Sequence, residues 1–265
     1  MSKLRFRHIA AAVATAALTL SSAAFAADKP TVVLVHGAFA ESSSWNGVAA
    51  NLQQQGYPVV AVANPLRSLT TDANYVASLV KQTAGPVVLV GHSYGGAVIS
   101  NAVQDNTNVT ALVYVAAFAP EQGETVLELS GRYPGSTLGP TLATPVLLKD
   151  GNKDLYIQQD KFGEQFAADV PPAEATLMAA TQRPVTELAL AEAAGEPAWH
   201  NIPSWAIYGT ADKNIPPAAM KFMAQRAQAK KIVEVSGASH VVMTSHPDKV
   251  AALIAEAATS AATAK

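Results

Sequence analysis

Six short runs rich in Val, Ile, Leu and Ala recur along the chain, and they constrain its fold more than any other feature. They lie at residues 31–35, 58–62, 86–90, 111–115, 204–208 and 231–235. In most of them the apolar residues are nearly continuous, which is typical of parallel strands buried on both faces. Segments with a helical pattern separate the runs, at residues 44–55, 71–82, 93–104, 216–228 and 247–258. The repetition predicts an α/β fold with a doubly wound, mostly parallel sheet of about six strands.

The interval from Pro120 to Pro203 does not follow this alternation of apolar runs and helical segments. It contains the pair Pro171-Pro172 and two helix-like segments, at residues 173–182 and 185–195, but no run of the same apolar kind. We expect a helical cap at about residues 120–203, inserted in a single domain that spans residues 27–265; an elaborate crossover connection is the alternative. Ligands of open α/β sheets bind beyond the carboxyl ends of the strands, so a cap at that edge would cover the binding site.

The first residues have the features of a secretory signal. A basic start precedes an apolar stretch at residues 9–20, and Ala24 and Ala26 fit the small-residue rule for cleavage. The pattern predicts a signal peptide over residues 1–26 and export to the periplasm or the medium; an N-terminal anchor helix is the alternative. No later run reaches the roughly 18 apolar residues of a membrane helix, so we expect no membrane association.

Composition excludes several classes of function. The chain has 18 Lys and Arg against 20 Asp and Glu residues, a net charge of −2, and removal of the basic start makes it more acidic. This balance gives no reason to expect a nucleic acid or an anionic membrane as partner. The chain has no cysteine, which excludes disulfides, thiolate metal sites and a cysteine nucleophile.

The stretch Gly91-His92-Ser93-Tyr94-Gly95 matches the pattern G-x-S-x-G. It follows an apolar run and precedes a helical segment, as a nucleophile elbow requires. In such an elbow the chain turns sharply, and the glycines on either side of the serine avoid a collision. The pattern predicts Ser93 as a nucleophile; a glycine-rich turn without catalysis is the alternative.

A serine hydroxyl needs a base, and the base needs an acid. His240 follows the last predicted strand, and Asp212 follows the one before it. The order Ser93, Asp212, His240 is the one expected of an α/β-hydrolase. Other candidates fit less well: His36, His92, His200 and His246 as bases, and Asp150 and Asp154 as acids within the cap.

Two backbone N–H groups must bind the oxyanion. One is expected from Tyr94, which follows the nucleophile. The other is expected from the loop after the first strand, with Ala38 preferred to Phe39 as the donor. His36, in the same loop, is expected to brace it by hydrogen bonding rather than to take part in the chemistry.

Four stretches together carry a family resemblance: LVHGAFAESSSW, LVGHSYGG, YGTADKNIP and GASHVV. In this order they resemble the α/β-hydrolase superfamily, and most of all the compact serine esterases related to plant methylesterases and hydroxynitrile lyases. The resemblance covers residues 31–258. It implies that the strand at residues 58–62 is an edge strand beside the strand at residues 31–35, and that the two N-terminal strands of the full family sheet are missing.

These features predict an exported serine hydrolase that cleaves small-to-medium apolar carboxylic esters through an acyl-enzyme. The expected partner is a small-molecule ester, held in part by apolar side chains of the cap, and the chemistry calls for no metal or organic cofactor. A lyase or a cofactor-free perhydrolase with the same triad is the first alternative. Hydroxynitrile lyase activity would want a cation beside the serine, and none is evident near Ser93 in the sequence. A non-catalytic small-molecule binding protein is the second alternative.

Overall fold

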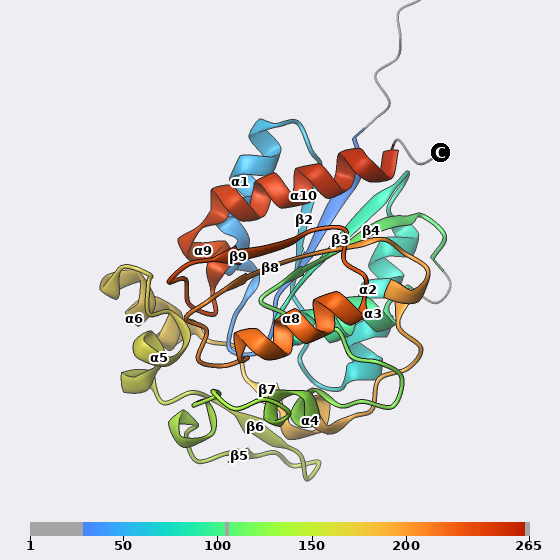
Figure 1. Cartoon of the computed structure of the whole chain (residues 1–265). Helices are drawn as coiled ribbons and strands as arrows, with labels where there is room; N and C mark the ends of the chain where they lie inside the picture. Colours follow the sequence, from blue (N-terminus) through green and yellow to red (C-terminus); the bar gives the residue numbers. More distant parts are fainter. Residues whose placement is uncertain (1–28, 104–105, 263–265) are drawn as a thin grey trace, which may run out of the picture.

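A computed structural model describes residues 29–103 and 106–262, so the predicted signal peptide at residues 1–26 lies outside the described residues. Its centre is a six-stranded sheet in the order β2-β1-β3-β4-β8-β9 with all neighbours parallel (Figure 1). The strands are β1 (Thr31–Val35), β2 (Val59–Val62), β3 (Val87–His92), β4 (Val109–Val115), β8 (Ser204–Gly209) and β9 (Ile232–Val235). The predicted six-stranded parallel sheet is confirmed, including β2 as an edge strand beside β1.

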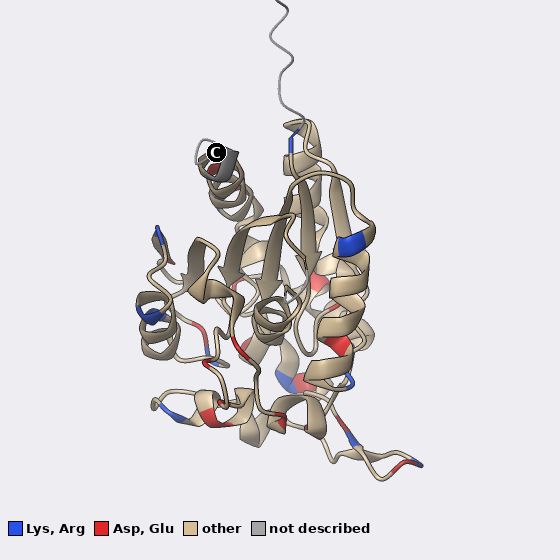
Figure 2. Ribbon diagram, turned by 90° about the vertical axis from the view of Figure 1, so that its right-hand side faces the viewer, with Lys and Arg blue, Asp and Glu red and all other residues tan. Residues whose placement is uncertain are grey.

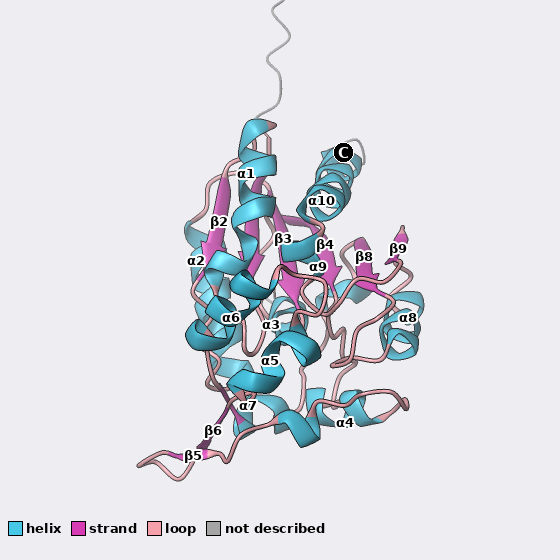
Figure 3. Cartoon of the chain, turned by 90° about the vertical axis from the view of Figure 1, so that its left-hand side faces the viewer, coloured by secondary structure: helices cyan, strands magenta, loops and turns pink. Residues whose placement is uncertain are grey.

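Helices cover both faces of this sheet. On one face lie α1 (Asn46–Gln54) and α10 (Pro247–Ala262), which pack against each other. On the other lie α2 (Leu69–Gln82), α3 (Tyr94–Asn101) and α8 (Pro217–Arg226) (Figures 1 and 3). The short η1 (Ser42–Trp45) and α9 (Val242–Ser245) flank α1. Every residue of β3 is buried, whereas the edge strands β2 and β9 are partly exposed, because an inner strand has helices on both sides and a strand on each edge.

Most of the segment between β4 and β8, here called the cap segment (residues 120–203), lies beyond the carboxyl ends of the strands (Figure 3). Its last residues return to the amino end of β8. Its helices are α4 (Val126–Gly131), α5 (Gln159–Phe166), α6 (Pro172–Thr181) and α7 (Glu187–Ala191), with the 3-10 turns η2 (Gly139–Thr141) and η3 (Ala198–His200). Three short strands, β5 (Val146–Leu147), β6 (Lys153–Leu155) and β7 (Val185–Thr186), form a separate antiparallel sheet. The sequence predicted only helices there, because strands of two or three residues are too short to show alternation.

Ion pairs tie the cap segment to the rest of the molecule. Lys and Arg residues are interspersed with Asp and Glu residues along the ribbon (Figure 2). Arg67 Nη1 lies 2.6 Å from Asp154 Oδ1 of β6. Glu124 accepts hydrogen bonds from Arg226 of α8 and from Arg132 of the cap segment.

Among the described residues, no helix combines the length and the apolar character that a membrane crossing requires.

Candidate active site

Ser93 occupies the sharp turn between β3 and α3. Its backbone has φ 54° and ψ −124°, a left-handed region that a non-glycine residue adopts only when its surroundings hold it there. The Ser93 N–H donates to the Val115 carbonyl oxygen at 3.3 Å, and the Phe118 N–H donates to the Ser93 carbonyl oxygen at 3.1 Å. These bonds to the end of β4 and to the loop after it fix the strained turn, and Ser93 lines the wall of a cavity.

Glycines make room for this turn. A Cβ on Gly91 would lie 2.5 Å from the Gly95 carbonyl oxygen, and a Cβ on Gly95 would overlap the carbonyl oxygen of Val35. A Cβ on Gly37 would lie 2.5 Å from Ser93 Cβ and 3.0 Å from Tyr94 N. The expectation that side chains at Gly91 and Gly95 would collide is confirmed, and Gly37 meets the same restriction from the neighbouring loop.

His240 and Asp212 meet beyond the ends of β9 and β8. His240 Nδ1 lies 2.6 Å from Asp212 Oδ2, and both side chains are almost completely buried. The other carboxylate oxygen, Oδ1, accepts hydrogen bonds from the N–H groups of Asn214 at 2.8 Å and Ile215 at 3.0 Å. The carboxylate is therefore held in place, and the contact assigns the imidazole proton to Nδ1, which leaves Nε2 as a proton acceptor.

One cavity of about 190 Å³ brings the predicted site residues together. Ser93, His240, Ala38 and Tyr94 all line it. Most of the remaining wall is apolar: Phe39, Phe118, Val126, Leu127, Leu138, Leu142, Leu155, Phe166, Leu190 and Ile215. Its other polar side chains are Ser130, Ser136 and Asn214, and none of the described residues that line it is Lys, Arg, Asp or Glu.

The loop after β1 packs against the turn at Ser93. The Phe39 N–H donates to the carbonyl oxygen of Arg183 at 3.0 Å, so it is already engaged with the cap segment. Of Ala38 and Phe39, the two candidate N–H donors to the oxyanion in this loop, the geometry favours Ala38. Tyr94 is the first residue of α3, where backbone N–H groups have no partner within the helix and attract negative charge.

His36 holds this loop from behind. Its Nδ1–H donates to the Gly37 carbonyl oxygen at 3.0 Å, and its Nε2 accepts from the Asn64 N–H at 3.0 Å. The Asn64 side chain donates to the His36 carbonyl oxygen at 2.9 Å. Burial lowers the pKa of His36 to about 4, so the ring is neutral near pH 7 and serves as a brace.

Of the remaining histidine and acidic candidates, His92 packs beside His240, with ring centres 4.7 Å apart, and the others do not line the cavity. His92 is fully buried and its Nε2 lies 3.1 Å from the His240 carbonyl oxygen; burial and the neighbouring His240 hold its pKa well below the usual range. The other groups have partners of their own: His200 pairs with Glu121, His246 with Asp169, Asp154 with Arg67, and Asp150 with Asn152.

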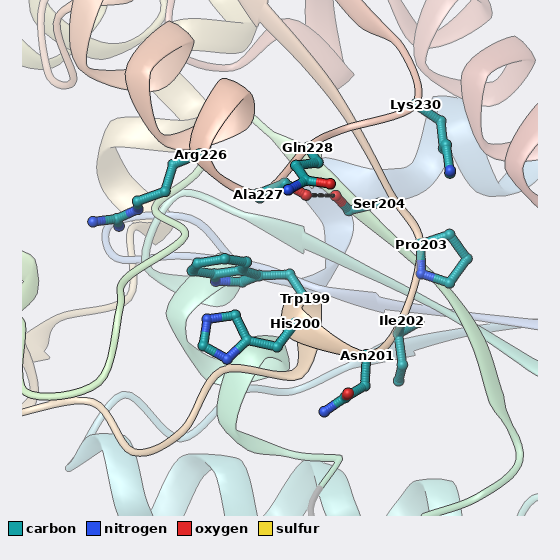
Figure 4. A pocket seen from close by; sticks show the side chains of 10 residues that line it. All are labelled: Trp199, His200, Asn201, Ile202, Pro203, Ser204, Arg226, Ala227, Gln228 and Lys230. Atoms are coloured by element: carbon teal, nitrogen blue, oxygen red, sulfur yellow. Dashed lines mark hydrogen bonds between the residues drawn. The ribbon is translucent and has the colours of Figure 1, made fainter.

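A second cavity, of about 310 Å³, lies at the amino end of β8 (Figure 4). Trp199, His200, Arg226 and Lys230 are among its lining residues. The Arg226 guanidinium lies 5.6 Å from the centre of the Trp199 ring and is bonded to Glu124. This cavity lies at the opposite end of the strand from Asp212, and its lining lacks the Ser93 and His240 pair.

Two cap residues support the site without having been predicted in this role. Gln165 is buried, and its Nε2 donates to Asn214 Oδ1 at 3.0 Å and to the Lys213 carbonyl oxygen at 2.9 Å. The Phe166 ring centre lies 5.1 Å from that of His240. A lone Gln in a helix gives no sequence signal of burial, and nothing in the sequence distinguishes Phe166 from the other apolar residues of the cap segment.

The profile of the Alpha/beta hydrolase family matches residues 32–253, and the chain therefore belongs to this family. Salicylic acid-binding protein 2 of Nicotiana tabacum is 24% identical over 249 residues, covering 85% of this chain and 96% of that protein. Alpha-hydroxynitrile lyase of Arabidopsis thaliana is 24% identical over 240 residues, covering 82% and 93%. The crystal structure of polyneuridine aldehyde esterase superposes with a TM-score of 0.74 at 18% identity, covering 86% of this chain and 98% of that one.

Proposed function

We propose that the protein is a serine hydrolase that cleaves small-to-medium apolar carboxylic esters. The observation that carries the proposal is the His240–Asp212 bond at 2.6 Å, with His240 and Ser93 on the wall of one cavity. In the proposed reaction His240 Nε2 takes the Ser93 proton as the oxygen attacks the ester carbonyl. His240 then gives that proton to the leaving alcohol, and a water activated by the same ring hydrolyses the acyl-enzyme.

The negative charge that develops on the carbonyl oxygen is bound, in this proposal, by the N–H groups of Ala38 and Tyr94. A donor of this kind contributes about 3 kcal/mol to the stability of the transition state. Asp212 holds the His240 ring in the required tautomer and stabilises its charged form. All of these groups belong to the polypeptide, so the proposed reaction uses neither a metal ion nor an organic cofactor.

The cavity supports a neutral, largely apolar substrate. Its wall is formed mainly by leucine and phenylalanine side chains, and its volume is about 190 Å³. A charged acyl group would lose its hydration in this cavity without gaining an oppositely charged partner. The names of relatives that act as esterases agree with this class of substrate.

A lyase is the second candidate, because one relative is a hydroxynitrile lyase. That reaction would want a cation beside the serine, and the described residues that line the cavity include no Lys or Arg. The cavity thus favours ester hydrolysis. The same triad could also serve a perhydrolase, and the same cavity could serve a non-catalytic small-molecule receptor.

Turnover of p-nitrophenyl esters with acyl chains from two to twelve carbons tests the proposal. We expect hydrolysis that is fastest for short and medium chains and that disappears in Ser93→Ala. Cyanohydrin cleavage that exceeds ester hydrolysis would favour the lyase, and perhydrolysis in the presence of hydrogen peroxide and acetate would favour the perhydrolase. Tight binding of an ester without turnover would favour the receptor.

We also propose that the protein is exported. Support comes from the sequence alone, through the basic start, the apolar stretch and the small residues Ala24 and Ala26. Expression of the full chain in a bacterial host should yield an exported form whose first residue is at or near Ala27. N-terminal sequencing that finds Met1 or Ser2 on the exported form would contradict this proposal.

A further inference from the structure

Asp72 is a fully buried carboxylate that lies outside the proposed triad. It belongs to the first turn of α2, where the helix dipole favours a negative charge. The backbone N–H of Arg67 lies 3.2 Å from Asp72 Oδ1 and 3.1 Å from Oδ2. Burial raises the pKa of Asp72, although these hydrogen bonds oppose the shift. A buried carboxylate without partners is costly, so a further donor to Asp72 stabilises its charged form.

That donor is the Tyr94 hydroxyl, which donates to Asp72 Oδ2 at 2.8 Å. Tyr94 is buried, and α2 packs directly against α3 (Figure 1). The same residue has two separate tasks: its backbone N–H is one of the proposed oxyanion donors, and its side chain reaches across to the neighbouring helix. The phenol–carboxylate bond therefore ties the first residue of α3 to α2.

We propose that Asp72 is a positioning residue, which acts through the Tyr94 hydroxyl to hold the Tyr94 N–H toward the oxyanion. The inference rests on the proposed function and deepens it. The peptide group between Ser93 and Tyr94 is orientated by the strained backbone of Ser93, with φ 54° and ψ −124°. Relaxation of that strain would rotate this peptide and displace the first turn of α3. A charge-assisted hydrogen bond from Tyr94 to a neighbouring helix resists the displacement.

The hydrogen bond between the Tyr94 hydroxyl and Asp72, here called the anchor, is connected to the cap segment through Arg67. Arg67, whose N–H holds Asp72, donates from Nη1 to Asp154 Oδ1 at 2.6 Å and from Nη2 to the Pro184 carbonyl oxygen at 2.9 Å. The Arg67 carbonyl oxygen in turn accepts a hydrogen bond from the Thr186 hydroxyl. The chain of contacts runs from β6 and β7 through Arg67 and Asp72 to Tyr94, so the placement of the cap segment and of the oxyanion donor are connected.

Deletion of the Tyr94 hydroxyl tests the anchor, because Tyr94→Phe keeps the backbone N–H. The matched control is Tyr114→Phe: Tyr114 is also a buried tyrosine, and its hydroxyl lies 2.8 Å from the Ser100 hydroxyl. We expect kcat for a p-nitrophenyl ester to fall about 10- to 100-fold in Tyr94→Phe, with KM changed less than about threefold. Tyr114→Phe should keep kcat within about twofold even where it lowers the melting temperature.

The inhibition constant of a tetrahedral inhibitor separates the positioning role from a purely structural one, because a purely structural role would leave this constant unchanged. Butylboronic acid forms an adduct with a serine nucleophile and places a boron-bound oxygen where the oxyanion would be. Its inhibition constant should rise about tenfold in Tyr94→Phe and stay unchanged in Tyr114→Phe. In the double variant with Asp72→Ala, which removes the acceptor of the Tyr94 hydroxyl, the loss of kcat should not exceed that of the worse single variant, because both changes remove the same bond.

Equal kcat in wild type and Tyr94→Phe, or equal losses in Tyr94→Phe and Tyr114→Phe, would overturn the anchor. If Tyr94→Phe does not fold, Asp72→Ala, which removes the acceptor, takes its place with the same expected loss, and failure of both to fold would assign the bond to stability alone. Full activity of Ser93→Ala, by contrast, would overturn the proposed function itself. The two failures are therefore distinguishable.

Discussion

Asp212 and His240 are 28 positions apart in the chain, and yet the His240 imidazole donates to the Asp212 carboxylate at 2.6 Å. The two residues follow adjacent parallel strands, β8 and β9. Parallel strands end at the same edge of a sheet, which brings residues that follow them within reach of each other. The same edge holds Ser93 at the end of β3, and the candidate active site is a direct consequence of this topology.

Replacement of Asp212 by Asn should lower kcat about 10⁴-fold and leave the fold intact. Oδ1 of residue 212 accepts from two backbone N–H groups, so the NH₂ group of an asparagine there would face His240 Nδ1. The ring would then carry its proton on Nε2 and lose its ability to accept one from Ser93. Steady-state kinetics on a p-nitrophenyl ester measure the loss.

Asp150→Asn is the matched control, because Asp150 is an exposed carboxylate of the cap segment. It should retain wild-type kcat. A nearly silent Asp212→Asn together with a large loss in a variant of another carboxylate would show that the triad has a different acid.

Substitution of Gly37 by Ala should abolish activity and destabilise the fold. The new Cβ would lie 2.5 Å from Ser93 Cβ and 3.0 Å from Tyr94 N, so either the loop after β1 or the nucleophile turn must shift. Gly163→Ala, in α5, is the control, since its Cβ would meet Ala175 Cβ at an ordinary 3.8 Å. That variant should be as stable as wild type or up to about 1 kcal/mol more stable. Thermal melts and kcat of both variants, measured side by side, decide whether the contact at Gly37 is as tight as described.

The pH dependence of stability should reflect the buried His36. Its pKa is lowered to about 4 in the folded protein by burial, against about 6.5 in the unfolded chain. The unfolded state therefore binds the proton more readily, and stability is full above pH 6.5 and falls as the pH drops toward 4. The shift corresponds to about 3 kcal/mol of unfolding free energy. Urea unfolding at a series of pH values measures the fall.

His36→Gln removes the titrating group and should make this fall shallower. The part that remains belongs to other groups, and the buried His92, whose pKa is also lowered, is among them. An identical pH profile in the variant and the wild type would mean that His36 does not carry the effect.

The sequence predicted the central sheet well, because parallel strands that are buried on both faces are continuous apolar runs in the sequence. The run at residues 86–90 corresponds to β3, and the glycines around Ser93 mark a turn that no other residue type fits. The Tyr94–Asp72 bond could not be foreseen, since an Asp in the first turn of a helix is equally typical of an exposed position. β5, with two residues, is likewise defined by its pairing with β6 and not by its own pattern.

The width of the cavity should set the acyl-chain preference. Leu138 lines the cavity from the cap segment, and Leu138→Ala enlarges it. We expect the ratio of kcat/KM for p-nitrophenyl octanoate to that for the butyrate to rise about tenfold. Leu177→Ala is the control, because Leu177 is an exposed leucine of α6 outside the lining of this cavity. An unchanged ratio in Leu138→Ala would show that the acyl chain binds elsewhere.

Covalent labelling tests most directly whether Ser93 is the nucleophile. Wild-type protein is treated with a fluorophosphonate, and its mass and residual esterase activity are followed together, with Ser93→Ala and Ser239→Ala in parallel. Ser239 is the matched control: it precedes the proposed base, and its Oγ is buried without a hydrogen-bond partner among the described residues. We predict that the wild type takes up one phosphonyl group per chain on Ser93 and loses esterase activity in step with labelling. Ser93→Ala should take up no label, and its kcat should be lowered about 10³- to 10⁶-fold. Ser239→Ala should be labelled and inactivated as the wild type is. Esterase activity that survives complete labelling, or that persists in Ser93→Ala above about a tenth of the wild-type value, would contradict the assignment of Ser93 as the nucleophile.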